Sequence, residues 1–221
     1  MSFQWLQDGK GPNQLYGYDA RVMILSHRIK PYWVPNIQSS LQSVPSSILE
    51  NLHVRAVTYA DGCCNKSVSK NYATALRLKQ LGGVDEAFRY NKRFLDSEWL
   101  ARPRVAEMMS RRKGGGLWLW KPQLILQNLL DPSLPMHNGV LLYLDAGNHW
   151  LESNPRPLLK KWFAQSDIAA VRGCVLERDY TTPEMLNFLG LSYRHTIVDT
   201  PQYSAGLMAI RKTPGSIQLK K

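Results

Sequence analysis

Hydrophobic and polar positions follow a strand-like pattern at several places after residue 52. The run HVRAVTYA at 53–60 is apolar and β-branched, as in a buried strand, and it ends at the turn residues Asp61–Gly62. Val140–Leu144 is a continuous apolar run, which is typical of a strand covered on both faces. Shorter runs of the same kind predict further strands at Phe88–Tyr90, Ile168–Val171 and Ala205–Ile210.

Helical spacing of apolar residues appears between these strands. Lys70–Leu81 has this spacing and is closed by Gly82–Gly83, and Ser97–Arg112 has it with an early interruption at Pro103. Pro122 suits the first turn of a third helix, whose inner face would carry Leu124, Ile125 and Leu129. Two more helices are predicted at Pro157–Phe163 and Thr182–Leu189. Because strands and helices alternate, the pattern favours an α/β fold with a central sheet flanked by helices.

The first 50 residues differ from the rest of the chain. They are rich in Gln, Ser, Pro and Asn, and they contain one strand-like run, Arg21–Leu25. We therefore expect residues 1–50 to be an irregular N-terminal extension and residues 51–221 to be one domain, since 221 residues suffice for one full core.

Asp145 is the residue at which chemistry is most expected. It follows the apolar run ending at Leu144 and precedes the small residues Ala146 and Gly147. An open α/β sheet binds ligands at the carboxyl ends of its strands. Burying an unpaired carboxylate in a strand costs free energy, so Asp145 is expected at a position where a partner or solvent reaches it. Two interpretations are open: Asp145 contacts a metal ion or a ribose, or it is a salt-bridged or capping residue of a turn.

A glycine loop lies upstream of this aspartate. The segment RRKGGGLWLWKP, residues 111–122, contains three consecutive glycines, which permit positive φ angles and close approach of a ligand to the backbone. It lacks the P-loop pattern. Trp118 and Trp120 alternate as in a strand, so we expect them on the same side, either in the core or as a wall of a sugar pocket with Gly115 and Gly116.

A second strand end carries polar residues. Tyr59, Ala60 and Asp61 end the first predicted strand of the sheet, where a nucleotide's base and ribose bind in many α/β folds, although Asp61 is equally compatible with a plain turn. The five histidines are scattered, and only His149, four residues after Asp145, is close to a candidate site.

Composition restricts the class of protein. The formal charge of +11 indicates affinity for something anionic, or merely a solvated basic surface. No apolar run approaches the ~20 residues that span a bilayer, and no secretory signal precedes the domain. Of the three cysteines, Cys63 and Cys64 are adjacent and no CxxC pair exists, which favours a reducing, cytoplasmic location over a disulfide or zinc framework.

Residues of about 53 to 219 resemble a group of GT-A-type glycosyltransferase-like proteins found in bacteria and large viruses. The matching segments, in order, are YADGCCNKSVSKNYATAL, FRYNKRFLD, GGGLWLWKPQLILQNLL, GVLLYLDAG and DTPQYSAGLMAIRKTPGS. The segment WLWKP followed by YLDAG is the most specific part. The resemblance implies a GT-A-like, Rossmann-like fold with a mixed central sheet flanked by helices.

The resemblance also implies a function and a set of residues. It implies transfer of a sugar from a nucleotide-diphosphate sugar to a glycan or lipid-linked acceptor, assisted by a divalent metal, Mn²⁺ or Mg²⁺. Asp145 matches the first acid of the DXD motif, whereas Gly147 replaces the second, so another metal ligand must come from elsewhere, with His149 as a candidate. The implied donor-binding residues are Tyr59, Ala60, Asp61, Lys121, Asp145, Ala146, Gly147 and Gln202.

Relatives of this kind usually continue to a His-Arg-His-Asp-Gln segment, which looks catalytic and which this chain does not reach before Lys221. The resemblance therefore implies that the C-terminal part of the domain is missing, that the catalytic residues lie beyond Lys221, and that transfer by this chain is weak. Two other functions are open: a catalytically inactive nucleotide-sugar or glycan-binding module, and a basic nucleic-acid-binding protein, which lacks the usual motifs of that class.

Overall fold

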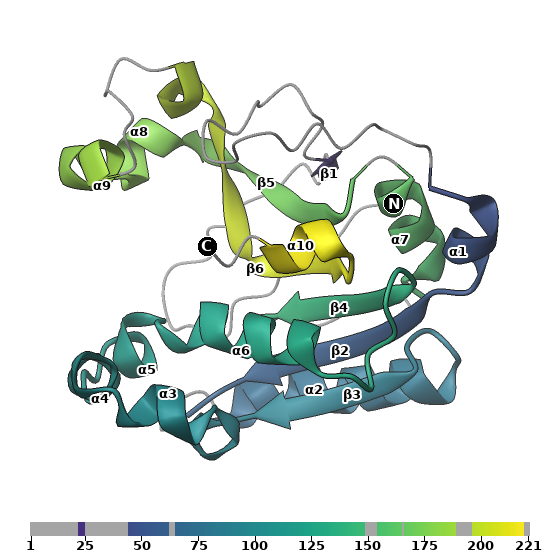
Figure 1. Cartoon of the computed structure of the whole chain (residues 1–221), viewed down its shortest axis with the longest axis horizontal. Coiled ribbons are helices and arrows are strands. Elements are labelled where there is room, and N and C mark those ends of the chain that lie inside the picture. The colour runs from purple at the N-terminus through teal and green to yellow at the C-terminus, as the bar shows by residue number, and fades with distance from the viewer. Residues whose placement is uncertain are drawn as a thin grey trace.

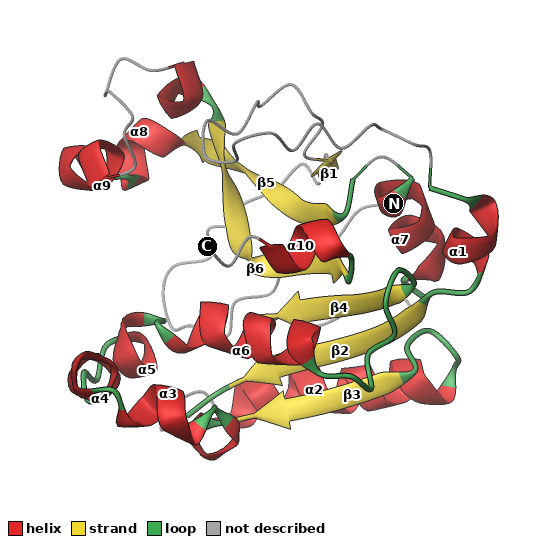
Figure 2. Ribbon diagram, in the orientation of Figure 1, coloured by secondary structure: helices red, strands yellow, loops and turns green. Residues whose placement is uncertain are grey.

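The structure is a computed structural model of the chain, and it describes residues 22–24, 44–61, 65–148, 154–164, 166–188 and 196–218. Its central feature is an open mixed sheet with helices on both faces (Figures 1 and 2). The α/β class expected from the alternating pattern is therefore confirmed. Within the described residues, no helix is long and apolar enough to cross a membrane.

In the described part of the chain, six strands form the sheet in the order β1-β5-β6-β4-β2-β3. Strand β2 is parallel to both β3 and β4, whereas β6 lies antiparallel between β4 and β5, and β1 pairs antiparallel with β5. The carboxyl ends of β2 and β4 consequently meet at one edge of the sheet. The strand bounds are β1 Val22–Ile24, β2 His53–Tyr59, β3 Glu86–Tyr90, β4 Gly139–Leu144, β5 Ile168–Leu176 and β6 Pro201–Arg211.

The two longest described helices lie on connections between the parallel strands: α2 joins β2 to its neighbour β3, and α6 lies on the connection from β3 to β4, on the other side of β2. In Figure 1, α6 crosses in front of the sheet and α2 lies behind it. The helix bounds are α1 Ser46–Glu50, α2 Asn65–Gln80, α3 Ser97–Ala101, α4 Pro103–Met109, α5 Gly114–Leu117, α6 Trp120–Leu130, α7 Arg156–Phe163, α8 Glu177–Tyr180, α9 Pro183–Phe188 and α10 Pro214–Gln218, with 3₁₀ turns at Lys92–Phe94 and Thr196–Asp199.

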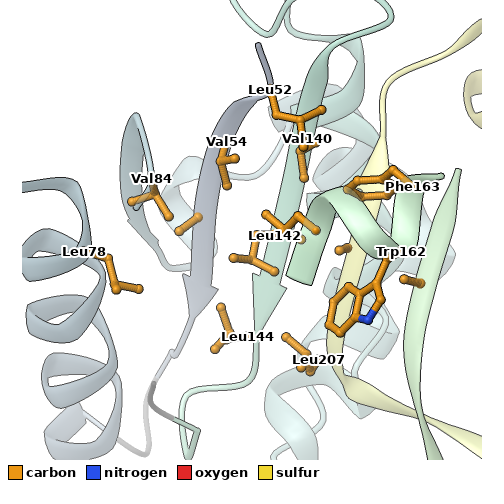
Figure 3. Close-up of a cluster of buried hydrophobic side chains, with 14 of the residues drawn as sticks. Leu52, Val54, Leu78, Val84, Val140, Leu142, Leu144, Trp162, Phe163 and Leu207 are labelled. Atoms are coloured by element: carbon orange, nitrogen blue, oxygen red, sulfur yellow. The ribbon is translucent and has the colours of Figure 1, made fainter. Parts of the chain in front are cut away.

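One face of the sheet packs against α2 and α7. Alternate residues of the strands point to this side, since side chains of a strand alternate between its faces. Figure 3 shows Leu78 of α2 and Trp162 and Phe163 of α7 over the strand residues. The buried strand residues of this cluster are Val54 and Ala56 of β2, Val140, Leu142 and Leu144 of β4, Ala169 and Val171 of β5, and Leu207 and Ala209 of β6.

The opposite face packs against α4 and α6. Leu124 and Leu129 of α6 are buried, and Ile125 is partly buried against them, as the helical spacing predicted. They lie over the other alternating set of strand residues, among them Val57, Leu141 and Tyr143. Strand β4 is therefore buried on both faces, as its continuous apolar run predicted.

A buried arginine joins the central strands to the loop before β4. Arg55 of β2 is 1% exposed, and its guanidinium donates to Glu86, to Asp131 Oδ2 at 2.7 Å and to Ser133 Oγ at 2.7 Å. Lys212 donates from the other side to the carbonyl oxygens of Asp131 and Leu134. Such charges are tolerated in a core only when they are paired and hydrogen-bonded.

Several element bounds differ from those predicted. Helix α2 begins five residues before the expected Lys70. The helix expected at Ser97–Arg112 is two short helices, because Arg102, which precedes Pro103, has the extended conformation that proline imposes on its neighbour. Strand β5 extends beyond Val171, and β6 begins at Pro201, before the expected Ala205. The two strands pair antiparallel with register shifts after Ala170 and after Arg172, and a side-chain pattern does not report such irregular backbone pairing.

The two ends of the described chain also contain regular structure. Two elements lie within the expected irregular extension 1–50. Val22–Ile24, inside the predicted strand-like run Arg21–Leu25, is a strand that pairs with β5. Ser46–Glu50 is a helix, and its Leu49 packs on the core. The sequence pattern predicted no helix after Ala205–Ile210, but α10 follows β6 and packs beside α6. A five-residue helix is too short to give a clear periodic pattern.

Candidate functional site

The candidate site is centred on Asp145, which directly follows β4 at the carboxyl edge of the sheet. Its Oδ1 accepts a hydrogen bond from the Tyr143 hydroxyl and lies 2.9 Å from Nζ of Lys121. Tyr143 and Asp145 are two positions apart, so both side chains point to the α6 side of the sheet. The Asp145 side chain is 40% exposed, so the carboxylate remains open to a ligand while one oxygen is held.

The backbone around Asp145 is fixed from three directions. Its N–H donates to Gly206 O of β6 at 2.8 Å, and its carbonyl accepts from Asn71 Nδ2 of α2 at 2.8 Å and from the Asn148 N–H at 2.9 Å. The Asn148 side chain in turn donates to Gly206 O at 2.9 Å. The turn that carries Asp145 is therefore tied to β6 and α2, which holds its carboxylate in place.

Gly206 allows this close packing. A Cβ at this position would lie 3.3 Å from Asp145 Oδ2 and 3.2 Å from Asn148 Nδ2. Any side chain there would crowd the oxygen of Asp145 that Lys121 does not hold.

Lys121 reaches the site from the first turn of α6. Its ammonium donates to Ala205 O at 3.1 Å in addition to pairing with Asp145, and its side chain is only 12% exposed. The Nζ also lies 5.1 Å from the Tyr143 ring centre and 5.7 Å from that of Trp120, within the range of cation–π attraction.

An aromatic stack lies beside this ion pair. Trp120, 5% exposed, stacks on Tyr59 of β2 with ring centres 3.9 Å apart, and its indole N–H donates to Gly114 O at 2.9 Å. The Tyr59 hydroxyl is buried and makes no hydrogen bond within the described structure. Because β2 and β4 are parallel, this stack and Asp145 lie at the same edge of the sheet.

Burial keeps both tyrosines protonated. It raises the pKa of Tyr143, and the charge of Asp145 together with the hydrogen bond that it accepts raises this pKa further. Burial also raises the pKa of Tyr59, with a smaller contribution from the charge of Asp61. Tyr143 therefore acts as a hydrogen-bond donor to Asp145 across the physiological pH range.

The glycine loop forms a left-handed turn. Residues Gly114 to Trp118 have φ angles of 61°, 59°, 100°, 54° and 59°. The turn is closed by hydrogen bonds from the N–H of Leu117 to Lys113 O at 2.8 Å and from that of Trp118 to Gly114 O at 3.3 Å. A run of left-handed residues is costly for any residue except glycine. The turn, which includes the short element α5, directly precedes α6 and so positions Trp120 and Lys121.

This turn corrects one prediction about the tryptophans. Trp118 and Trp120 are not in a strand and do not point to the same side, because Trp118 is left-handed and 50% exposed, whereas Trp120 is buried. Trp120 is a core residue that also borders the site. Gly115 is near the other strand end, since a Cβ there would lie 3.8 Å from both Asp61 O and Trp120 Nε1. Gly116 is buried against Met109 and is not open to a ligand.

The remaining expected site residues are partly brought together. Ala60 and Asp61 follow β2, and Ala146 and Gly147 form the turn after Asp145, with open space around Gly147. Gln202 lies near the start of β6, five positions before Leu207, and it is Leu207 that pairs with Leu144 at the end of β4. No described contact joins Gln202 to Asp145. His149 lies outside the described residues.

Sequence reasoning did not select Tyr143, Asn71, Asn148 or Gly206. Tyr143 could have been found, because it is two residues before Asp145 in a strand and must share its face. The other three are close to Asp145 only through contacts between separate elements, which no local pattern reports.

The described residues do not by themselves fit a divalent-cation site. They contain no group of three or more His, Cys, Asp or Glu side chains placed to share an ion. The one carboxylate at the centre of the site already has an oxygen paired with an ammonium. Comparisons of this chain with protein-family models, curated proteins and solved structures found no match.

Proposed function

We propose that this chain binds a nucleotide-diphosphate sugar at the edge formed by β2 and β4 and acts as a glycosyltransferase domain. One observation carries the proposal: the Asp145 carboxylate and the Lys121 ammonium are held side by side, at the carboxyl ends of parallel strands, next to the Tyr59–Trp120 stack. This edge is where open α/β sheets bind nucleotides. The resemblance in sequence independently points to the same residues.

Each group has a chemical role in the proposed complex. Lys121 binds the diphosphate, because an ammonium is a strong donor to phosphate oxygens. Asp145 accepts hydrogen bonds from ribose or sugar hydroxyls through Oδ2. The end of β2 at Tyr59–Asp61 contacts the base and ribose, and the glycine turn at Gly115 admits the donor close to the backbone.

The proposed reaction is displacement at the anomeric carbon of the donor sugar. The bond from this carbon to the diphosphate oxygen breaks, and the diphosphate departs with the electron pair. An acceptor hydroxyl forms the new bond, and its proton passes to a phosphate oxygen of the departing diphosphate. Lys121 favours this step by stabilising the negative charge that develops on the diphosphate. No residue of this chain is assigned as the base.

A divalent ion is the cofactor that the resemblance implies, with Asp145 as its ligand. An ion of this kind would supply charge stabilisation for the departing diphosphate. Because the described residues do not fit such an ion, the steps above are assigned to side chains of the chain alone.

The test is a thermal-shift screen of nucleotide sugars, since a ligand stabilises only the state that it binds. Hits are then measured by calorimetry, and their hydrolysis or transfer is followed separately. Asp145→Asn is expected to lower affinity at least tenfold, and Glu98→Gln, which removes an exposed carboxylate on α3, is expected to have no effect. Stabilisation by no member of the panel would refute the proposed function, whereas binding without turnover would favour the inactive-module alternative.

A further inference from the structure

The Lys121 ammonium lies against two oxygen atoms of the kinds that bind metal ions. Its Nζ lies 2.9 Å from a carboxylate oxygen, Asp145 Oδ1, and 3.1 Å from a backbone carbonyl oxygen, Ala205 O. Carboxylate and carbonyl oxygens are the ligands that Mg²⁺ and similar hard cations prefer. The lysine therefore uses two oxygen atoms, Asp145 Oδ1 and Ala205 O, that a divalent ion would otherwise have as ligands.

The ammonium is held at this position by more than one contact. Two aromatic rings, of Tyr143 and Trp120, lie 5.1 and 5.7 Å from the Nζ, and the side chain is 12% exposed. The Tyr143 hydroxyl donates to the same Oδ1 and so fixes the carboxylate as well. An ordinary surface lysine has none of these constraints, and its side chain samples many rotamers.

The pair of charges changes what this site attracts. The carboxylate of Asp145 is neutralised by its lysine, so little net negative charge is left to draw a divalent cation from water. A cation on the same carboxylate would also be close to an ammonium of the same sign. The same pairing reduces the net positive charge that an anion meets, so what the ammonium offers a phosphate oxygen is chiefly a hydrogen-bond donor.

We propose that Lys121 replaces the divalent cation, so that donor diphosphate binds to this chain without a metal ion. This inference rests on the proposed function, because it concerns the same diphosphate. An ammonium has three N–H donors. That of Lys121 donates to Ala205 O and forms an ion pair with Asp145 Oδ1. An N–H group that these two contacts leave over is the proposed donor to a phosphate oxygen.

The test is calorimetric titration of the full chain with UDP, GDP and inorganic pyrophosphate as probes. Each is measured once in EDTA and once in excess Mn²⁺. Lys121→Gln removes the charge at the site, and Lys113→Gln removes an equal charge from an exposed position just before the glycine turn. The thermal melting of each variant is recorded, and the comparison of EDTA with Mn²⁺ on the unmodified chain requires no variant.

We expect at least one probe to bind with affinities that agree within threefold in EDTA and in Mn²⁺. Lys121→Gln is expected to lose at least tenfold in affinity and Lys113→Gln less than threefold. A tenfold or larger loss in EDTA, or a Lys121→Gln variant that binds as well as Lys113→Gln does, would overturn the inference and leave the proposed function standing. If no probe binds in either condition, the proposed function fails and this inference with it.

Discussion

The left-handed turn at Gly114–Trp118 gives a sharp test of how the chain is shaped before α6. Gly115 and Gly116 are adjacent, and both have positive φ angles, 59° and 100°. Their surroundings differ. A Cβ at Gly115 would meet its nearest atoms at 3.8 Å, whereas a Cβ at Gly116 would lie 2.8 Å from the backbone Cα of Met109 and 2.6 Å from its sulfur.

The magnitudes follow from these two environments. At Gly115, alanine adds about 1–2 kcal/mol of left-handed strain, and restricting the unfolded chain offsets about 0.4–1 kcal/mol of this. We therefore expect Gly115→Ala to lower the free energy of unfolding by roughly 1 kcal/mol. Gly116→Ala carries the same terms plus about 1–3 kcal/mol of overpacking against a backbone atom, which cannot rotate away, so we expect a loss of roughly 2–4 kcal/mol.

The assay is equilibrium denaturation of both variants, with the unfolding free energy taken by linear extrapolation. Gly82→Ala is the matched control, because Gly82 has a φ of 71° and a Cβ added there would have nothing within 4 Å, so it reports left-handed strain alone. We expect Gly82→Ala and Gly115→Ala to lose similar amounts of unfolding free energy, and Gly116→Ala to lose clearly more than either. If Gly116→Ala is no more destabilising than Gly115→Ala, the turn does not pack against Met109 in this way.

Three further predictions concern Arg55, Asp131 and Tyr143, whose polar groups are hydrogen-bonded within the fold. Arg55→Met should lower the unfolding free energy by about 3 kcal/mol, as measured by denaturation. This is the low end of the range for a broken buried ion pair, because the partner carboxylates of Arg55 are partly exposed. Burial acts to raise the pKa of Asp131, but hydrogen bonds from Ser133 and Arg55 outweigh it and hold this pKa below its ordinary value of 3.8. The ionised carboxylate therefore contributes its full stabilisation above the pKa of the unfolded chain. This stabilisation is lost as the pH falls through the lower pKa of the folded protein. Asp131→Asn should therefore be less stable than the parent at neutral pH, and the difference should shrink in acid. Tyr143→Phe removes a hydrogen-bond donor to Asp145, so it should lower the unfolding free energy by about 1 kcal/mol and weaken UDP binding. If the variant binds UDP as tightly as the parent chain does, the Tyr143 hydroxyl does not position the carboxylate.

The sequence by itself determined the strands and helices that depend on local pattern. The apolar run Val140–Leu144 predicted a strand buried on both faces, and the spacing of Leu124 and Leu129 predicted the inner face of α6. Such patterns work because burial on a sheet or helix face repeats with the period of the backbone. They also placed Asp145 at a strand end without any knowledge of its neighbours.

Where the backbone departs from a regular period, the same reasoning failed. Trp118 and Trp120 looked like alternate strand residues, yet three glycines allow a left-handed turn that sends one ring to solvent and the other to the core. A pattern of side chains does not report the sign of φ. The glycines indicated that such a turn was allowed, but not that it formed.

Only the tertiary structure decided which groups share the candidate site. Lys121 and Asp145 are 24 positions apart in sequence, and Ala205 is a further 60 positions on, yet oxygens of Asp145 and Ala205 both lie within 3.1 Å of the Lys121 ammonium. The sequence allowed Asp145 to be a metal ligand or a salt-bridged residue equally well. The choice of partner depends on how α6 and β6 pack beside β4, because an ion pair forms between whichever charges the packed elements bring together, and no local pattern encodes that distance.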